Sequence, residues 1–400
     1  MLPIVIIAGG VASRLEPYSG ETHKCFMELE PNVAILDFVL NRIEEINSPR
    51  ILIVVRSQFK NVFEEKLKGK AELIETDVEE FGNLYSVSLA MKHLDAGSFL
   101  LLMSDHIFER SILDRVLSLN SQAAFTVCLD KNPSRAEAKE GLKLALSGEA
   151  VVSADKATPP QHGIDTGIIL CREDSKAYIE RAIENFGFKA TIADALNLAA
   201  ADGKVDCVDV TGKLWKDVDT PEDLVAARKV YWQILRKELT KPEDGLVSRY
   251  LNRSISTRIS IMAYRRGFKI EPFTVTLVSF FLGLSASLLL AMRAFILGGL
   301  LVQAASIIDG VDGELARLYC KATPWGGYLD SVLDRVSDVA IVAGLTLSLP
   351  IIDDFTFLFA ILAAANVIFV SYITHNLNSL GVSTEKLRKV PATRDVRLFV

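Results

Sequence analysis

Two pairs of aspartates between residues 309 and 334 have the side-chain types and spacing that metal-dependent phosphoryl chemistry needs. Asp309 and Asp312 are three residues apart, and Asp330 and Asp334 are four apart. Each pair therefore lies on one face of its own helix. Two facing pairs of carboxylates can hold two divalent cations with a pyrophosphate group between them. We expect all four aspartates to be metal ligands of such a site.

The alternative for these acids is ordinary solvation at helix ends, with ion pairs to Arg317 and Arg335. One pair alone would suit that alternative. Both pairs, however, adjoin apolar runs, and carboxylates beside membrane spans are costly unless they serve a site. Gly313 and Gly326 lie near the acids and leave room for a ligand or for close helix contact. Asp338 lies one helical turn beyond Asp334, and we assign it no role.

A second set of chemical residues begins near the N-terminus. Gly9 and Gly10 follow a short apolar run, and Arg14 and Lys24 come soon after. Small residues let backbone amides approach phosphate oxygens closely. The two cations would stabilise the negative charge that builds up as pyrophosphate leaves a nucleoside triphosphate. We expect Gly9 and Gly10 to bind the nucleotide, and Arg14 and Lys24 to be catalytic.

Two acids complete this expected first site. Asp105 follows the apolar run 98–103, and Asp219 lies in the segment 215–221. Two carboxylates that converge from distant strand ends can hold the Mg²⁺ ion of a bound nucleotide. We therefore predict metal ligation by Asp105 and Asp219.

The elements that must position this first site alternate between strands and helices. Apolar runs at 3–8, 50–55 and 98–103 have the length of buried strands, and 35–46 and 85–93 have helical spacing. This alternation predicts an α/β, Rossmann-like domain with a mostly parallel sheet covered on both faces. Ligands bind at the carboxyl ends of such strands.

Four further apolar runs predict an all-α polytopic membrane domain. They are residues 273–292, 294–308, 339–352 and 355–374. The first and the fourth carry no charge along their whole length, and a helix needs ~20 residues to cross a bilayer. The acid pairs would then lie at the ends of consecutive spans, where they can meet.

The segment between the two parts is basic and amphipathic. Residues 222–241 have the pattern of an amphipathic helix, and residues 231–272 form the expected linker and interfacial helix. Arginines alternate there with Leu, Ile and Met, which suits the surface of a membrane. An ordinary solvated helix is the alternative. The arginines are Arg249, Arg253, Arg258, Arg265 and Arg266.

Charge is segregated along the chain. Residues 1–230 hold 26 basic and 36 acidic side chains, whereas residues 231–400 hold 18 and 14. Basic residues gather in the loops expected on one side of the membrane, and the positive-inside tendency places that side and the acidic head in the cytoplasm. We expect a multi-pass protein of the cell membrane, with domains at 1–230, 231–272 and 273–400.

The five cysteines form no C-x-x-C pair, which disfavours a disulfide scaffold or a zinc site and fits a reducing compartment. Residues 394–400 begin another apolar stretch that is too short to span a bilayer. We therefore expect the natural protein to continue beyond Val400, so that residues 273–400 are a C-terminally incomplete membrane domain.

Residues 1–230 resemble the sugar-phosphate nucleotidyltransferases. The resemblance rests on AGGVASRL at 8–15, Lys24, SDH at 104–106 and DVDTPEDL at 217–224. It implies that the glycine loop and arginine grip the nucleotide, that the lysine contacts phosphate and that two aspartates bind Mg²⁺. The residues that take these roles are Gly9, Gly10, Arg14, Lys24, Asp105 and Asp219.

This head departs from the family pattern at two positions and matches it in two weaker segments. Ala12 stands where the loop often has glycine, and His23 stands where proline is common; both changes could reduce or retune activity. Gly82-Asn83 with Ser86 resembles the segment that touches the base. The residues 165–167, Asp-Thr-Gly, resemble the segment that meets the sugar phosphate. For each, a plain turn is the alternative.

The acid-rich segment resembles the CDP-alcohol phosphotransferases. Their pattern, D-x-x-D-G-x-x-A-R-x8-G-x3-D-x3-D, is complete from residue 309 to residue 334. The resemblance implies that Asp309, Asp312 and Asp330 bind metal and that Asp334 is the general base and a shared ligand. Gly313 and Arg317 would meet the CMP moiety. Phe273 stands where the family usually has asparagine, which puts nucleotide contacts there in doubt.

Together with GIDTGIILC at 163–171 and SRYLNRSIS at 248–256, the two parts resemble a bifunctional family. That family joins an inositol-1-phosphate cytidylyltransferase to a di-myo-inositol-phosphate-phosphate synthase. The resemblance implies that CDP-inositol is made from CTP and inositol 1-phosphate, and that the inositol phosphate then passes to a second inositol 1-phosphate with release of CMP. The product would be the precursor of an osmolyte.

The cofactor implied is Mg²⁺, with Mn²⁺ as the alternative. The partners are CTP, a CDP-alcohol, a phosphorylated polyol and the lipid bilayer; no nucleic acid is expected, and a homodimer stays open. Two rival hypotheses also stay open. In one the acceptor is a lipid, so that the protein makes a phospholipid, and in the other the head is a silent binding or regulatory module.

Overall fold

The computed structural model describes residues 2–10, 23–44, 46, 48–94, 97–148, 150–156, 162–240, 248–319, 321 and 323–379. The chain divides into two compact units, Met1–Ile234 and Leu235–Val400. We call them the head and the helical unit.

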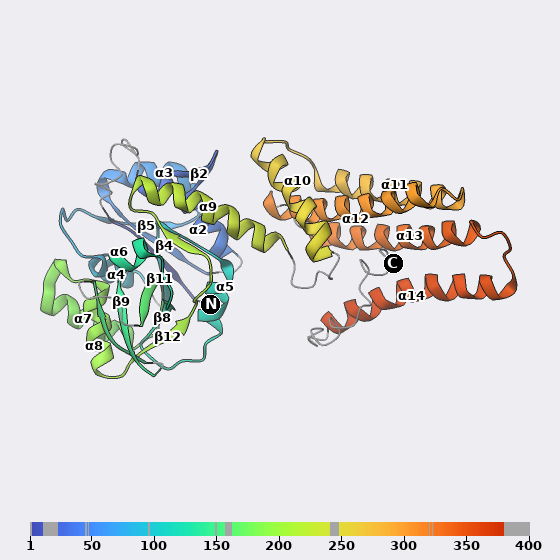
Figure 1. The fold of residues 1–400 in the computed structure, drawn as a ribbon. Coiled ribbons are helices and arrows are strands. Elements are labelled where there is room, and N and C mark those ends of the chain that lie inside the picture. The colour runs from blue at the N-terminus through green and yellow to red at the C-terminus, as the bar shows by residue number, and fades with distance from the viewer. Residues whose placement is uncertain are drawn as a thin grey trace. The chain divides into compact units, whose positions relative to one another are not determined.

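A nine-stranded sheet forms the centre of the head, in the order β5-β4-β1-β6-β11-β8-β12-β10-β9 (Figure 1). The sheet is parallel from β5 to β6 and again between β8 and β12, whereas β11 runs antiparallel to both of its main neighbours, β6 and β8. The strands are β1 (Ile4–Ala8), β4 (Ile51–Arg56), β5 (Glu72–Thr76), β6 (Phe99–Met103), β8 (Phe125–Asp130), β9 (Lys143–Ser147), β10 (Ala150–Asp155), β11 (Gly163–Cys171) and β12 (Val205–Asp209).

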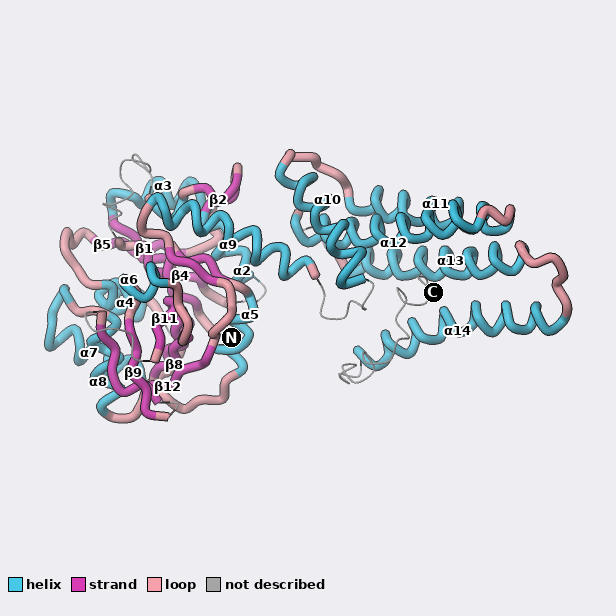
Figure 2. Tube along the Cα trace, in the orientation of Figure 1, coloured by secondary structure: helices cyan, strands magenta, loops and turns pink. Residues whose placement is uncertain are grey.

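Helices cover both faces of this sheet, which Figure 2 shows as a magenta layer between cyan helices. Along β1, Val5 and Ile7 join one buried cluster, while Ile4, Ile6 and Ala8 join the other. This alternation follows from the period of two in a strand. The first cluster includes residues of α4 (Asn83–Met91), α7 (Ser175–Phe186) and α8 (Ile192–Ala201); the second includes residues of α2 (Ile35–Glu44), α3 (Lys60–Leu67) and α5 (Arg110–Ser118).

The head also contains two small ribbons and several shorter helices. One ribbon pairs β2 (Glu28–Glu30) with β3 (Val33–Ala34), and the other pairs β7 (His106–Phe108) with β13 (Trp215–Asp217). The second ribbon brings the segment after β6 beside the segment before α9 (Pro221–Leu239), although these lie more than a hundred residues apart in sequence. The remaining helices are α6 (Arg135–Glu140) and the 3-10 turns η1 (Lys24–Phe26), η2 (Ser57–Phe59) and η3 (Gly187–Lys189).

The expected α/β architecture is confirmed, with one difference in strand direction. All of the strands and helices predicted in this head appear within a few residues of their expected bounds. The sheet is mixed rather than mostly parallel, because β9, β10 and β11 form antiparallel pairs. A buried apolar run does not reveal the direction of its neighbour, so the sequence pattern could not distinguish the two arrangements.

The helical unit contains long helices that run side by side, as Figure 1 shows for α11, α12 and α13. Pro272 and Pro324 begin α11 and α13, where a missing amide hydrogen is tolerated, and Thr323 caps α13 by accepting from the Gly326 amide at 3.0 Å. The elements are η4 (Ser248–Asn252, a π-helix), α10 (Arg253–Arg265), α11 (Pro272–Ala291), α12 (Phe295–Leu318), α13 (Pro324–Leu347) and α14 (Asp354–Ser379).

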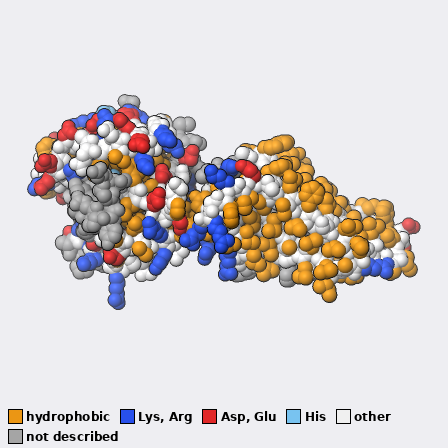
Figure 3. All heavy atoms as spheres, turned by 90° about the horizontal axis from the view of Figure 1, so that it is seen from above, with side chains coloured by type: hydrophobic (Ala, Val, Ile, Leu, Met, Phe, Trp, Pro, Cys, Tyr) orange, Lys and Arg blue, Asp and Glu red, His pale blue; other side chains and the backbone are white. Residues whose placement is uncertain are grey.

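Two helices in the described part of the chain, Pro272–Ala291 and Phe295–Leu318, are long and apolar enough to cross a membrane. Large apolar side chains cover much of the visible surface of the helical unit, coloured orange in Figure 3, whereas charged side chains are frequent on the head. Ile296 is 81% exposed and Leu300 is 66% exposed. Such exposed residues need an apolar solvent, which a bilayer provides.

The helix bounds differ from the apolar runs in the sequence. α12 continues through Asp309 and Asp312 to Leu318, and α13 begins at Pro324, well before the expected run at 339–352. α13 ends at Leu347, so the last residues of that run lie outside the helix, close to Pro350, which restricts the residue before it. The four acids are therefore inside continuous helices rather than at helix ends, which disfavours the helix-end alternative.

Candidate active sites

A cavity of about 720 Å³ in the head opens at the carboxyl ends of β1 and β6. Gly9 and Gly10 follow β1 and line it, and Asp105 follows β6 and lines it from the next strand. Lys24 and Asp219 reach the same cavity from η1 and from the segment after β13. The structure thus brings together five residues predicted from the sequence. Arg14 and Ala12 lie outside the described residues.

Lys24 is the electrostatic centre of this cavity. Its ammonium group forms an ion pair with Asp105, and its Nζ donates to Asp219 Oδ1 at 2.6 Å. Lys24 itself is only 8% exposed. One buried cation therefore holds two carboxylates that come from distant parts of the chain.

The protonation states follow from this arrangement. Burial alone would lower the pKa of Lys24, but the charges of Asp105 and Asp219 outweigh it and raise that pKa. Burial would raise the pKa of Asp105, yet the nearby Lys24 and His106 hold it well below its usual range. Lys24 is thus charged and Asp105 ionised at neutral pH. An anionic phosphate can share Lys24, and the two carboxylates are the oxygen ligands that Mg²⁺ prefers.

His23 and Cys25 flank Lys24 and are buried. Burial, followed by the Lys24 charge, lowers the pKa of His23 to about 4, so its imidazole is neutral at pH 7. Its Nδ1 accepts a hydrogen bond from the Cys25 amide at 3.3 Å, which a protonated Nδ1 could not do. His23 also packs edge-on against Phe59 and Phe63. The replacement of the family's common proline thus places a neutral aromatic ring in the core.

In this cavity, Arg56 was not singled out from the sequence, and His106 received no role there beyond its place in SDH at 104–106. Arg56, at the end of β4, donates from Nε to the Gly9 carbonyl and from Nη1 to the Glu79 carbonyl, each at 2.8 Å. Its guanidinium also lies 4.7 Å from the centre of the Phe81 ring. His106 Nδ1 donates to the ionised carboxylate of Asp105 at 2.7 Å. An arginine that follows a strand is too common a pattern to be recognised in advance.

The two weaker segments also reach the cavity. Gly82 precedes α4 with no room for a side chain, since a Cβ there would lie 2.0 Å from the Ala190 carbonyl oxygen. Asn83 accepts from the Ile192 amide at 2.8 Å, and Ser86 is buried beside Gly9. The segment that contains Gly82, Asn83 and Ser86 therefore contributes to packing and to a backbone hydrogen bond. The contacts of the two segments with base and sugar phosphate stay predictions.

Asp165 and Gly167 line the cavity from β11. Asp165 Oδ1 accepts from the Gly167 amide at 3.0 Å, and burial raises the pKa of Asp165 to about 6. Gly167 has a φ of +78°, and a Cβ there would lie 2.8 Å from the His106 ring. Only glycine fits that backbone conformation beside His106 without strain.

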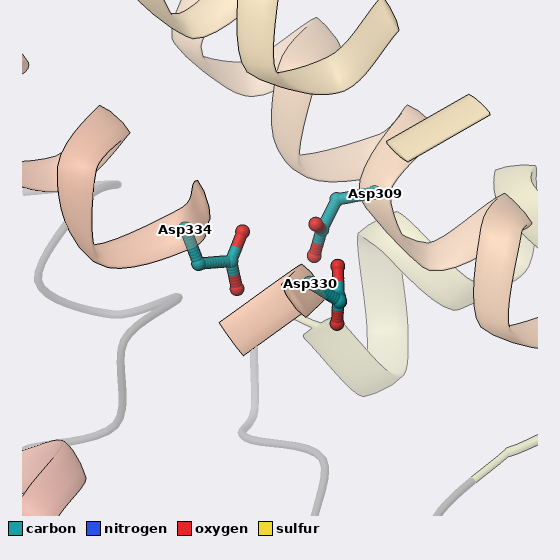
Figure 4. Close-up of side chains that lie close together, drawn as sticks. All are labelled: Asp309, Asp330 and Asp334. Carbon is teal, nitrogen blue, oxygen red and sulfur yellow. The ribbon is translucent and has the colours of Figure 1, made fainter. Parts of the chain in front are cut away.

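In the helical unit, three of the four predicted acids converge. Carboxylate oxygens of Asp309, Asp330 and Asp334 all lie within 4.8 Å of one another. Figure 4 shows Asp309 on α12 and the other two on α13, with their carboxylates directed toward the same point. Three hard oxygen donors at this separation fit a divalent cation such as Mg²⁺ or Mn²⁺.

Asp312, the fourth predicted acid, contacts α11. It is 6% exposed, and its Oδ2 accepts from Thr276 Oγ1 of α11 at 2.5 Å. It is not part of the group of three formed by the described residues. Asp312 nevertheless lies on the same helix as Asp309, one turn further along. Its role as a metal ligand stays a prediction.

The remaining residues that the sequence singled out in this segment have contacts of their own. The Gly313 backbone lies beside Arg317, since a Cβ on Gly313 would lie 3.4 Å from Arg317 Nη1. Arg335 forms ion pairs with two acids: its Nη2 lies 3.6 Å from Asp334 Oδ2, and its Nη1 lies 3.4 Å from Asp338 Oδ2. Asp338 is almost fully buried. The predicted ion pair between Arg335 and the acids thus exists beside the carboxylate group and does not replace it.

Comparison with known proteins defines the class of each part. The model of the MobA-like NTP transferase domain matches residues 4–204, and that of the CDP-alcohol phosphatidyltransferases matches residues 270–395. A solved inositol-1-phosphate CTP transferase from T. maritima covers 58% of this chain and 96% of its own, with a TM-score of 0.53 and 20% identity. That likeness shows the nucleotidyltransferase fold of the head.

Two relatives match across both parts. A bifunctional IPC transferase and DIPP synthase of Aquifex aeolicus is 31% identical over 99% of this chain and 90% of its own length. One of Rubrobacter xylanophilus is 36% identical over 80% of this chain and 71% of its own. The chain is therefore a nucleotidyltransferase joined to a CDP-alcohol phosphotransferase. It belongs to the family of bifunctional IPC transferases and DIPP synthases.

Proposed function

We propose that the head makes CDP-inositol from CTP and inositol 1-phosphate, and that the helical unit then transfers the inositol phosphate to a hydroxyl of a second inositol 1-phosphate, releasing CMP. The observation that carries this proposal is the convergence of Asp309, Asp330 and Asp334 in a chain whose head holds a cavity lined by Lys24, Gly9 and Gly10. The full-length similarity to bifunctional relatives supports it and does not favour a lipid acceptor.

In the head, the residues divide the work as follows. The Gly9 and Gly10 backbone and Arg14 bind the triphosphate of CTP, and Lys24 neutralises the charge that develops on pyrophosphate. Asp105 and Asp219 hold the Mg²⁺ ion of the nucleotide. That ion would supply the positive charge needed between the phosphate groups. The charged state of Lys24, whose pKa Asp105 and Asp219 raise, supports this role.

In the helical unit, Asp309, Asp312, Asp330 and Asp334 hold the metal, with Gly313 and Arg317 at the CMP moiety. Divalent cations held by these carboxylates would supply the positive charge that polarises the phosphoryl group and stabilises the leaving CMP. Asp334 takes the proton from the acceptor hydroxyl. We further propose that the helical unit lies in the cell membrane as a multi-pass domain with the head in the cytoplasm, since basic loops favour that orientation.

The test is product analysis after incubating the full chain in detergent with CTP, Mg²⁺ and inositol 1-phosphate. We expect pyrophosphate and CMP in equal amounts and a phosphodiester in the aqueous phase. A product found only in the organic phase, after lipid is supplied, would show a lipid acceptor. CMP release from added CDP-inositol without any pyrophosphate from CTP would show a silent head.

A further inference from the structure

A second polar face of α12 contacts α10. Gln303, Ser306, Gly310 and Glu314 follow one another at intervals of three or four residues, which places them on one side of the helix. Asp309 and Asp312 lie on a different side, because each residue turns a helix by about 100°. The helix that carries two of the predicted metal ligands is thus contacted by α10 on this side and by α11 at Asp312.

Glu314 is the centre of this contact. It is fully buried, and both of its carboxylate oxygens accept hydrogen bonds from α10. Ser256 donates to Oε1 at 2.7 Å and Ser260 donates to Oε2 at 2.6 Å. Arg253 adds an ion pair, with Nη1 lying 3.2 Å from Oε1. All of these partners come from α10.

The contact continues along the helix toward the acids. Arg253 Nη1 also donates to the Gly310 carbonyl at 3.2 Å, next in sequence to Asp309. A Cβ on Gly310 would lie 2.8 Å from that nitrogen, so glycine makes room for the arginine. Further along, Asn252 donates to Ser306 at 2.9 Å and accepts from Gln303 at 2.5 Å. These seven residues, with Gly310, form what we call the α10–α12 seam.

A buried carboxylate is costly unless its hydrogen bonds are complete, and breaking such a group is more damaging than replacing it. Glu314 can contact Ser256, Ser260 and Arg253 together only when α12 is rotated about its axis to one particular angle. An apolar contact would tolerate small rotations, since its attraction has no direction. Rotation of α12 would also move Asp309 away from Asp330 and Asp334 on α13.

We propose that Glu314 is a positioning residue for phosphoryl transfer, which fixes the rotation of α12 so that Asp309 meets Asp330 and Asp334. This inference rests on the proposed function of that carboxylate group. Glu314 acts through α12 and does not touch the substrate or the metal. In this proposal α10, which the sequence placed at the membrane surface, also fixes the rotation of α12.

The experiment measures metal binding separately from turnover. Full-length protein in detergent is titrated with Mn²⁺ and free Mn²⁺ is followed by electron paramagnetic resonance. Asp330→Asn identifies which part of the binding belongs to the helical unit. We expect Glu314→Ala to weaken that part about tenfold or more, as happens when groups that orient metal ligands are removed. CMP release from added CDP-inositol should fall in parallel, while pyrophosphate formation stays within about twofold, since the head is untouched.

Matched serine variants separate positioning from general loss of packing. Ser260→Ala removes one hydrogen bond to Glu314, whereas Ser285→Ala removes only a bond to the Phe281 carbonyl within α11. We expect Ser260→Ala to weaken Mn²⁺ binding and Ser285→Ala to leave it unchanged. Glu314→Gln keeps an acceptor for a serine but loses the charge facing Arg253, so it should fall between wild type and Glu314→Ala. It also serves if Glu314→Ala does not fold.

Unchanged Mn²⁺ binding in folded Glu314→Gln and Ser260→Ala would overturn the proposal. Equal weakening in Ser260→Ala and Ser285→Ala would do so as well, because it would reveal a loss of packing alone. If the wild-type protein binds Mn²⁺ through Asp330 yet releases no CMP, the proposed function fails while the Mn²⁺ titration still decides the role of Glu314.

Discussion

At Lys24, one buried ammonium group forms ion pairs with both Asp105 and Asp219, which come from different parts of the head. The residue before it, His23, is buried as a neutral ring that accepts from the Cys25 amide. A proton on His23 would therefore remove a hydrogen bond and place a second positive charge beside Lys24. This makes the stability of the head sensitive to mild acid.

We predict that the head loses stability as the pH falls from about 6.5 toward 4. Burial lowers the folded-state pKa of His23 from 6.5 to about 4, so the unfolded chain binds the proton first. The stabilisation is fully present above the unfolded pKa and is lost as the pH falls through this window, by at most roughly 3 kcal/mol. The measurement is the temperature at which pyrophosphate formation is lost, at pH 7 and pH 5.

His23→Gln should flatten this pH dependence, because glutamine cannot take up the proton. The control is His93→Gln, since the His93 side chain is 49% exposed and its loss should leave the slope unchanged. Equal slopes for wild type and His23→Gln would contradict the prediction.

The acids of the helical unit should divide by role. Asp309→Asn and Asp330→Asn remove metal ligands and should reduce CMP release from CDP-inositol by about a thousandfold or more, as expected when a metal's charge stabilisation is lost. Asp334→Asn should keep most CDP-inositol binding, measured by calorimetry, while losing about 10²–10⁴ in turnover, the range for a general base. Asp353→Asn, exposed and remote from the group in sequence, is the control. Normal turnover by Asp334→Asn would remove its assignment as the base.

Residues that carry chemistry were predictable where their spacing is unusual. Two pairs of aspartates at helical spacing, beside a glycine and an arginine, pointed to a metal site, and Asp309, Asp330 and Asp334 do converge. Glu314 was not predictable in its role, because a glutamate within a charged stretch is usually solvated. Its burial depends on Ser256 and Ser260, which belong to another helix.

Helices α11 and α13 approach each other through small residues. A Cβ on Gly344 would lie 2.3 Å from the Ser287 carbonyl oxygen, and Ser287 Oγ donates to the Ala340 carbonyl at 2.5 Å. Helices with small residues at their contact can pack closely in a bilayer, where association depends on such packing. The same helix, α13, carries Asp330 and Asp334.

We therefore predict that Gly344→Val forces α11 and α13 apart. Adding atoms to a tight contact costs about 1–3 kcal/mol, so the melting temperature of the helical unit and CMP release should both fall. Gly299→Val on α12 is the control, because a Cβ on Gly299 meets nothing within 4 Å. Similar losses in both variants would mean that helix propensity, rather than the contact, is responsible.

Element types were easier to predict than element bounds. The alternation of short apolar runs and helical patterns predicted the head, and β1, β4 and β6 appear where expected. The bounds of α12 and α13 were missed because hydropathy falls at the acids, although the helices continue through them. Backbone hydrogen bonding ignores that change in polarity, and the acids are partly shielded by neighbouring helices.

Across the whole molecule, the residues of the two candidate sites belong to different units. The described head residues that line the 720 Å³ cavity lie before Ile234, and the converging acids lie after Leu235. Each unit also has its own buried clusters. Two units with separate cores and separate ligands can lose one activity without the other.

We predict that Lys24→Gln in the full chain stops pyrophosphate formation but leaves CMP release from added CDP-inositol within about twofold, since sites that share no residues or partners behave independently. A fragment of residues 1–234 should fold without detergent and form pyrophosphate from CTP and inositol 1-phosphate. Paired assays for pyrophosphate and CMP provide the check. Loss of both activities in folded Lys24→Gln would show that the two sites are coupled.

The completeness of the head's sheet before the first long apolar helix also sets an order of events during synthesis. Among the described residues, the last strand of the sheet in sequence, β12, ends at Asp209 and β13 of the small ribbon ends at Asp217, whereas α11 begins at Pro272. At about 5–20 residues per second, the ribosome needs several seconds to make the intervening segment. The pairing of β13 with β7 can therefore form while the chain is still being translated, before the apolar helices need a membrane. Delayed membrane targeting should then expose the helical unit to aggregation, with the head already folded.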